Sequence, residues 1–446
     1  MTGLADRTPQ ELAALHDQVL SDYQAFRARG LKLDMTRGNP SPEQLDLSVG
    51  MLSLPGNGDY VTESGDDARN YGGSPQGLPE ARALLAETLG APIERIVAAN
   101  NSSLSLMHDC IVYALLKGVP GGSSPWVEQK PIAFLCPVPG YDRHFGICAE
   151  YGIRMIPVPL TGQGPDMDVV VELVADPSVK GMWCVPQYSN PSGETYSDET
   201  VRRLGAMAAG APDFRLFWDN AYGVHHLTDR HHAVANIFAA CAAGGFPDRA
   251  FAFASTSKIT FGGAGLAFFA SSPANNAWLT ARMNRRSIGP DKLNQVRHVR
   301  FLRDAAGIKR QMASHRAILA PKFAAVQEEL AARLDGSGAA RWTQPEGGYF
   351  ITLDMLQGSA KRVVALAKEA GLALTPAGAT HPHGVDPQDR TLRIAPSYSL
   401  PAEVRLAAQG IGICVLLAAT EALLEKRGKS GAGPEMEQRS ARIAAG

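Results

Sequence analysis

The chain has 446 residues, with 43 lysines and arginines against 44 aspartates and glutamates. This length is too great for one compact core and predicts two or three domains. Because the charges balance, the sequence has no electrostatic signature of binding to nucleic acid or to an anionic membrane. No uninterrupted run of about 18 uncharged apolar residues occurs, and the first residues are unlike a secretory signal, so we expect a cytoplasmic protein. The six cysteines form no C-x-x-C pair, which predicts buried thiols.

The first half of the chain alternates between helical patterns and short apolar runs. A helix is predicted to begin at Pro79, with Ala81, Leu84, Leu85, Thr88 and Leu89 on one face, and a second helix covers residues 104–115. Five apolar runs follow, at 132–137, 181–186, 214–219, 250–255 and 265–270. Continuous apolar strands that alternate with helices are typical of a mostly parallel sheet covered on both faces, so the predicted fold class is α/β.

The last third of the chain has a different rhythm. A long helical pattern runs from about residue 299 toward Gly336, and we expect a break near Pro321. A strand-like stretch at 347–355, a helical segment and the run "LRIAP" come next. We therefore predict a large domain at 46–314, a smaller α+β domain made of 1–45 and 315–428, and a flexible tail at 429–446.

One lysine stands out in the stretch "STSKITFGGAGLAFF". Lys258 is the only formally charged residue between Arg249 and Arg282. A buried lone ammonium group is costly, and it escapes that cost by a lowered pKa or by a covalent bond. A neutral lysine can attack a carbonyl and form an imine. The alternative is a lysine whose charged end reaches water from a strand end.

Polar side chains follow the other apolar runs, at the edge where open α/β sheets place their ligands. They are Asp219 and Tyr222 after "LFW", Asn190 in "QYSNPSGE", Tyr141 after "FLCPVPG", and Ser102 and Ser103 before the second helix. The two serines lie where a helix N-terminus favours phosphate. A carboxylate at the position of Asp219 requires a cationic partner.

Together and in this order, these residues resemble the pyridoxal-phosphate (PLP) enzymes of the aspartate aminotransferase fold, over roughly Leu33 to Ser399. The motifs are Tyr71-Gly72, Asn101-Ser102-Ser103, Pro139-Gly140-Tyr141, Asn190-Pro191-x-Gly193, Asp219-x-x-Tyr222, Ser255-x-Ser257-Lys258, "PEGGYF" and "LRIAPSYS". The sequence is most similar to a divergent aspartate aminotransferase subgroup related to MocR-like aminotransferases. The resemblance implies a large PLP-binding domain and a smaller α+β domain.

The resemblance also implies roles for the residues around the cofactor. Lys258 would hold PLP as a Schiff base and carry a proton to and from the substrate. Asp219 would pair with the pyridine nitrogen, and Tyr222 and Asn190 would bond the phenolic oxygen. Tyr141 would stack on the ring. The catalytic set is thus Lys258, Asp219 and Tyr222.

The remaining implied roles concern the phosphate and the substrate. Ser102, Ser103, Ser255 and Ser257 would receive the phosphate, with Tyr71 reaching over from a second subunit, so a homodimer is expected. Arg393 would grip the substrate α-carboxylate, with Asn190 and Gly38 beside the substrate. Most relatives have a phosphate-clamping arginine about eight residues after the lysine, and "GGAGLAF" has none. Hydroxyls and backbone amides would then stabilise more of the negative charge of the phosphate.

The implied reaction moves an amino group from an L-amino acid, with L-aspartate expected, to 2-oxoglutarate by a ping-pong mechanism. A dicarboxylate substrate needs a second cation, for which Arg37, Arg285, Arg286 and Lys292 all remain candidates. Three alternatives stay open: an aromatic or aminoadipate-like donor, a PLP lyase or decarboxylase, and, less favoured, a PLP-binding regulator module. The regulator would need a DNA-binding domain, for which the sequence has no room before residue 33.

The stretch "HHLTDRHH" places His225, His226, His231 and His232 near Asp229. Its spacing matches no familiar zinc pattern, so we expect a polar loop and no metal.

Overall fold

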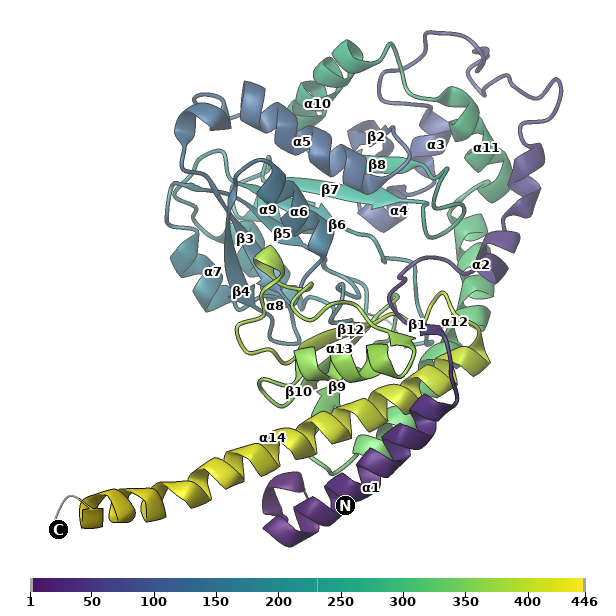
Figure 1. Ribbon diagram of the computed structural model, residues 1–446. Coiled ribbons are helices and arrows are strands. Elements are labelled where there is room, and N and C mark those ends of the chain that lie inside the picture. Colours follow the sequence, from purple (N-terminus) through teal and green to yellow (C-terminus); the bar gives the residue numbers. More distant parts are fainter. Residues whose placement is uncertain (1–2, 231, 444–446) are drawn as a thin grey trace.

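The computed structural model describes residues 3–230 and 232–443, with side chains as far as residue 427. A seven-stranded sheet dominates the upper part of Figure 1, and two smaller sheets lie below it among long helices. The order of the large sheet is β2-β8-β7-β6-β5-β3-β4. Its strands are β2 (Ile96–Ala98), β3 (Ala133–Val138), β4 (Arg154–Pro159), β5 (Val179–Cys184), β6 (Arg215–Asp219), β7 (Ala250–Ser255) and β8 (Ala267–Ala270).

The strands β3 to β7 pair in parallel, whereas β8 runs antiparallel to both of its neighbours. Every residue of β5 and β6 is buried, which explains why these strands read as continuous apolar runs. This confirms the predicted α/β class with a mostly parallel sheet.

Helices cover both faces of the large sheet. One face packs on α5 (Ser103–Lys117), α6 (Asp142–Glu150) and α10 (Pro273–Arg286). The other face packs on the helices that contribute to a second core. These are α3 (Pro79–Ala83), α4 (Ala86–Leu89), α7 (Met167–Leu173), α8 (Asp198–Ala206), α9 (Ile237–Ala243), α11 (Lys292–Leu302) and α12 (Ala305–Leu334).

The helix predicted to begin at Pro79 is two short helices, because α3 ends before Leu84 and α4 begins after Leu85. Both leucines are buried, so the predicted apolar face is used despite the interruption. The second predicted helix is present as α5, and its first turn is capped by Ser102, whose hydroxyl accepts from the Ser105 amide.

The expected break at Pro321 is wrong, because α12 continues through that proline. The long helical pattern is instead divided between α11 and α12 at Arg303, whose φ is 68°. Asp304 then caps α12 by accepting from the Gly307 amide at 2.7 Å. Leu319 and Phe323 are buried on either side of the proline, so tertiary packing holds the helix across one missing backbone donor.

The two smaller sheets lie in the lower part of Figure 1. One pairs β1 (Leu33–Asp34) with β11 (Leu372–Ala373) in parallel, and the other has the order β12-β10-β9. Its strands are β9 (Ala340–Trp342), β10 (Ile351–Met355) and β12 (Thr391–Ile394), and the surrounding helices are α1 (Pro9–Ala28), α2 (Pro42–Asp46), α13 (Ala360–Glu369) and α14 (Pro401–Ile443). One core joins all of these elements except α2, and it contains residues of both α1 and α14, so the two ends of the chain pack together. The exact domain bounds, 46–314 against 1–45 with 315–428, stay a prediction.

Helix α14 is the longest helix in Figure 1 and lies along α1 and α12. Its segment Pro401–Arg427 is long and apolar enough to cross a membrane by length and composition, and 61% of its most apolar window is buried inside the protein. The helix extends to Ile443, and the flexibility expected for 429–446 stays a prediction whose last three residues lie outside the described part. All six cysteines are buried, as predicted.

Candidate active site

Lys258 follows β7 in the turn that leads to β8, and its side chain lies over the ring of Tyr222. The distance from Lys258 Nζ to the centre of that ring is 4.9 Å. Burial of the amine lowers the pKa of Lys258, and the nearby carboxylate of Asp219 opposes that shift. The structure therefore brings Lys258, Asp219 and Tyr222 together at one edge of the sheet, with an amine that loses its proton more readily than a free lysine does.

Asp219 ends β6 and is almost completely buried. Its Oδ2 atom lies 3.2 Å from Nε2 of His144, an equally buried residue on α6. The imidazole stacks on Trp183, with ring centres 4.3 Å apart and planes 7° apart. The polar partner of Asp219 within the chain is thus a histidine that packing holds in one orientation.

The other oxygen of Asp219 has no partner. Its Oδ1 atom is buried and forms no hydrogen bond with any described residue. An unsatisfied buried carboxylate oxygen is expensive, so such atoms are rare except where a ligand supplies the donor. This edge of the sheet therefore offers one acceptor to an N–H group of a bound molecule.

Arg393 on β12 faces the same region from the smaller sheets. Its Nη1 atom lies 3.5 Å from Asn190 Oδ1 and 3.5 Å from Asp142 Oδ1, and its guanidinium carbon lies 4.8 Å from the centre of the Phe350 ring. The side chain is 11% exposed, and its Nε is buried without a partner in the described chain. These contacts are at the outer limit of hydrogen bonding, so the guanidinium fork retains donors for a carboxylate.

Gly38 lies against the ring that supports Arg393. A methyl group added at Gly38 would lie 2.2 Å from Cζ of Phe350, which is closer than any real contact. The close approach of Gly38 to the Phe350 ring therefore leaves no room for a side chain.

Four serines lie near the N-terminus of α5 and the start of the lysine turn. Ser102 caps α5 and Ser103 is its first residue, which leaves backbone amides at a positive helix end. Ser257 donates to the carbonyl of Asn101 at 3.3 Å, so the two segments adjoin, and Ser255 ends β7. A side chain at Gly265 would lie 2.8 Å from the Ser257 hydroxyl, so this close approach also requires glycine.

Tyr71 and the four candidate cations lie at different places. Tyr71 is 79% exposed, so this chain alone does not enclose it in the site. Arg37 pairs with Asp34 at 3.0 Å on the segment that carries Gly38. The other three candidates lie near α10 and α11: Arg286 bonded to Asn100, Arg285 exposed, and Lys292 buried beside Gly73.

The histidine-rich stretch is not gathered around one point. His225 donates from Nε2 to the carbonyl of Lys258 at 3.3 Å, and His226 Nδ1 lies 2.7 Å from the Tyr188 hydroxyl. His231 lies outside the described residues. Within 3–230 and 232–443, no group of three or more histidines, cysteines and acids could hold a metal.

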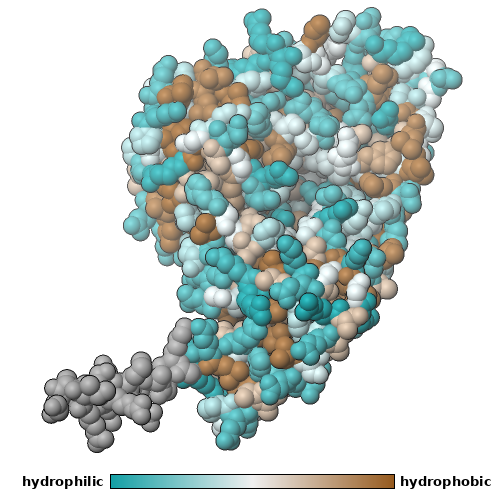
Figure 2. Space-filling model, viewed as in Figure 1, coloured by the Kyte–Doolittle hydropathy of each residue, from teal (hydrophilic) through white to brown (hydrophobic). Residues whose placement is uncertain are grey.

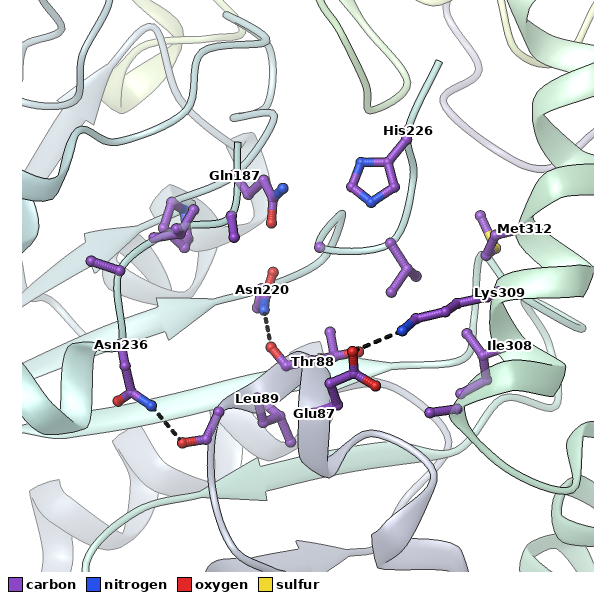
Figure 3. A pocket seen from close by; sticks show the side chains of 18 of the residues that line it. Glu87, Thr88, Leu89, Gln187, Asn220, His226, Asn236, Ile308, Lys309 and Met312 are labelled. Carbon is purple, nitrogen blue, oxygen red and sulfur yellow. Dashed lines mark hydrogen bonds and ion pairs between the residues drawn. The ribbon is translucent and has the colours of Figure 1, made fainter. Parts of the chain in front are cut away.

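A cavity of about 560 Å³ opens behind the end of β6 and is distinct from the site above (Figure 3). Asn220 lines it and donates to the carbonyl of Thr88 at 2.9 Å, while Lys309 pairs with Glu87 at 2.8 Å. The lining includes Trp218 and Asn220 but not Asp219, Tyr222 or Lys258. Trp218 and Asn220 thus face the cavity, whereas Asp219 between them faces the candidate active site.

Sequence reasoning missed four polar residues around the site: His144 beside Asp219, and Gln44, His298 and His315 around the turn that carries Lys258. His225 was expected only in a polar loop, and Tyr349 was given no role within its motif; both contact the Lys258 carbonyl. For His144, the available signal was its position three residues after Tyr141 in the first turn of α6. Thr256 and Thr260, on either side of Lys258, contact Nε2 of His298 at 2.9 and 3.2 Å. His298 lies in an apolar helical pattern, and nothing in that pattern indicates a contact with the residues around Lys258.

Comparison with known proteins identifies close relatives. The family model of aspartate amino-transferases matches residues 7–427. An aspartate aminotransferase of Corynebacterium glutamicum is 47% identical over 418 residues, covering 94% of this chain and 96% of the relative.

Solved structures agree with these matches. The crystal structure of an aspartate transaminase from Corynebacterium glutamicum superposes with a TM-score of 0.92 at 46% identity, covering 94% of this chain and 99% of the other. An α-aminoadipate aminotransferase from Thermus thermophilus, complexed with N-(5'-phosphopyridoxyl)-L-leucine, has a TM-score of 0.69 at 21% identity, covering 91% and 98% of the two chains. This last likeness concerns the fold alone.

Proposed function

This chain belongs to the aspartate amino-transferase family and is an aminotransferase, and we propose that it moves the amino group of L-aspartate to 2-oxoglutarate by a ping-pong mechanism with PLP as cofactor. The observation that carries this proposal is that one edge of the sheet holds both the amine of Lys258, whose pKa is lowered by burial, and the buried Oδ1 atom of Asp219, which has no partner in the described chain. The close relative from Corynebacterium glutamicum that is named for aspartate supports the choice of donor.

The residues of the site fit PLP. The unpartnered oxygen of Asp219 would accept from the protonated pyridine nitrogen, and Lys258 would form the covalent bond. Tyr222 and Asn190 would bond the phenolic oxygen, and Tyr141 would cover the ring. When bound, PLP supplies a ring that takes up the electrons of the substrate Cα–H bond.

The phosphate would lie at the N-terminus of α5. Ser102, Ser103, Ser255 and Ser257 would receive it, and the helix end adds a partial positive charge. These hydroxyls and amides would take the place of the arginine that the turn lacks.

Lys258 would also move the proton. Its lowered pKa leaves more of the amine neutral at neutral pH, so Nζ can take a proton from the substrate Cα and return it elsewhere. Tyr222 lies beneath that amine and would limit its positions.

Arg393 would bind the α-carboxylate of the substrate with both prongs of its guanidinium group. Phe350 supports the guanidinium group, and Asn190 Oδ1 lies 3.5 Å from its Nη1 atom. For the distal carboxylate of aspartate we favour Arg37, because it adjoins Gly38 and so lies on the Arg393 side of the site. The other three candidates lie near α10 and α11.

The active unit would be a homodimer in which Tyr71 completes the partner's phosphate site. Large hydrophobic residues are exposed on two segments of the chain, one before Tyr71 and one after α10. They are Val49, Leu52 and Val61 on the first segment and Ile288 and Leu293 on the second. Hydrophobic residues gather at the right edge of the molecule, over the segment Val49–Ser53 (Figure 2). Exposed apolar surface of this kind is typical of an interface. The protein would act in the cytoplasm on small amino and oxo acids, without a nucleic-acid or membrane partner.

The test is product analysis with purified protein and PLP. L-Aspartate with 2-oxoglutarate should give oxaloacetate and glutamate, with parallel lines in double-reciprocal plots. Borohydride treatment should fix the cofactor on Lys258, as mass spectrometry of the peptide would establish. Faster reaction with aromatic or aminoadipate-like donors would change the donor but keep the enzyme class. Release of ammonia or carbon dioxide in place of these products would overturn the proposal in favour of a lyase or decarboxylase.

A further inference from the structure

Gln44 lies at the centre of a buried hydrogen-bond network that ends on the backbone of Lys258. Gln44, His315 and Tyr349 are each fully buried and come from α2, α12 and the residues before β10. None of them belongs to the cofactor contacts proposed above.

The direction of each bond in this network is fixed by its neighbours. The backbone amide of Ser41 donates to Gln44 Oε1 at 3.0 Å, so the other end of the side chain is its NH₂ group. That NH₂ group lies 2.8 Å from His315 Nδ1 and donates to the Tyr349 hydroxyl at 2.9 Å. Both donors of Gln44 are therefore used, and Nδ1 of His315 must accept.

Two branches lead from Gln44 to the lysine turn. His315, with Nδ1 accepting, donates from Nε2 to the carbonyl of Ile259 at 3.0 Å. Tyr349 donates its hydroxyl to the carbonyl of Lys258 at 3.4 Å, where His225 adds a second donor at 3.3 Å. Burial lowers the pKa of His315 to about 4, which keeps the ring neutral and consistent with this pattern.

The same glutamine belongs to the segment that borders the substrate. Gly38 and Arg37 lie a few residues before it, and Ser397, four residues after Arg393, donates to the carbonyl of Asn39 at 3.0 Å. The segment 37–44 is thus bonded at one end near Arg393 and at the other end to the lysine turn.

We infer that Gln44 is a positioning residue, which holds the backbone of Lys258 through His315 and Tyr349 and ties it to the substrate-side segment. If Gln44 loses its NH₂ group, His315 Nδ1 and the Tyr349 hydroxyl both lose the donor that they share. Removing one member of a buried polar network can cost more free energy than the sum of its separate hydrogen bonds. The inference rests on the proposed role of Lys258, but the order of the turn can be measured without it.

The experiment compares Gln44→Met with Gln327→Met in the PLP-loaded full chain. Methionine keeps the length of glutamine and removes its donors. Gln327 is a matched control, because it donates to the Thr343 carbonyl at 2.9 Å and accepts from Trp342 at 2.7 Å beside the smaller sheet. The readouts are hydrogen exchange of the backbone amides in 256–266 and the pH midpoint of the cofactor absorbance.

In Gln44→Met we expect exchange in 256–266 to become about tenfold faster, and the absorbance midpoint to shift. Gln327→Met should leave both unchanged. Tyr349→Phe removes a single hydroxyl and should give a smaller change of the same sign, which keeps the test decisive if Gln44→Met does not fold. Wild-type exchange in both Gln44→Met and Tyr349→Phe would overturn the inference. Absence of aminotransferase activity would instead contradict the proposed function. It would not affect the interpretation of the hydrogen-exchange result.

Discussion

His144 holds one oxygen of Asp219 at 3.2 Å and leaves the other oxygen without a partner in the described chain. Because Trp183 stacks on the imidazole, the histidine cannot turn away, and the free oxygen keeps one direction. We therefore expect His144 to set the geometry with which Asp219 meets the cofactor.

The substitution His144→Phe keeps the stacked ring and removes the hydrogen bond. Loss of a partner from a buried charged group should lower kcat/KM by about tenfold to a hundredfold and weaken PLP binding as well. Steady-state kinetics and cofactor titration measure both effects. His108→Phe is the control, since His108 bonds Tyr151 away from Asp219. An unchanged kcat/KM in His144→Phe would contradict this role.

Three buried histidines around the lysine turn predict acid sensitivity. Burial lowers the pKa of His225 to about 3 and that of His298 and His315 to about 4, against an ordinary 6.5. The unfolded chain therefore binds more protons than the folded chain between pH 6.5 and about 4, so the free energy of unfolding falls as the pH falls through that range. His298 and His315 each contribute at most about 3 kcal/mol of this loss, and His225, whose pKa is lower, at most about 5 kcal/mol as the pH falls to about 3.

Urea unfolding at pH 7, 6 and 5 measures this dependence. His298→Gln should be less stable than wild type at pH 7, because it loses its contacts to Thr256 and Thr260. Its stability should also fall less steeply toward pH 5, because one titrating group is gone. A parallel decline in both proteins would mean that His298 is not held neutral.

The sequence predicted those parts of the fold and of the site in which one physical rule applies to many residues. Parallel strands end at a common edge, so Asp219, Asn190 and Lys258 could be placed together from the ends of apolar runs. Features that depend on tertiary contacts could not be predicted in this way. Pro321 did not break α12, because buried neighbours on both sides hold the helix.

The buried network could not be predicted for a related reason. Gln44 and His315 are 271 positions apart and meet only after the N-terminal segment packs on α12. A single polar residue in a helical pattern is ordinarily a surface or core residue, and its partner cannot be found from spacing alone. Such pairs are defined by the packing of elements distant in sequence.

Gly38→Ala tests the close approach of the N-terminal segment to Phe350. The added methyl group would lie 2.2 Å from the ring, so the ring must move from beneath Arg393. We expect KM for the amino donor to rise about tenfold, with PLP affinity little changed. Gly146→Ala is the control, because no atom lies within 4 Å of its added methyl group. Equal kinetics of the two variants would remove Gly38 from the substrate side.

Arg393→Lys tests the carboxylate contact directly. A lysine retains the charge but offers a point donor where the guanidinium group offers two parallel donors. KM for the amino donor should rise about tenfold to a hundredfold, while the dissociation constant of PLP stays near its wild-type value. Cofactor titration and donor kinetics on the same preparation separate the two quantities. A comparable loss of PLP affinity would mean that this arginine serves the cofactor.

Arg37→Met tests the choice of a dicarboxylate donor. The Arg37 guanidinium group pairs with Asp34 at 3.0 Å and lies 4.9 Å from the centre of the Tyr398 ring, while half of the side chain remains exposed. If it binds the distal carboxylate, kcat/KM for L-aspartate should fall about tenfold to a hundredfold, because that charge loses its partner. The value for L-phenylalanine, which has no distal carboxylate, should stay within about twofold.

The ratio of these two specificity constants is the decisive quantity, since a general loss of stability lowers both. Arg286→Met is the matched control, because Arg286 bonds Asn100 near the phosphate end of the site. It should leave the ratio unchanged. A fall in the ratio for Arg286→Met, with none for Arg37→Met, would place the distal cation at the α10 side and explain specificity by residues near the proposed dimer interface.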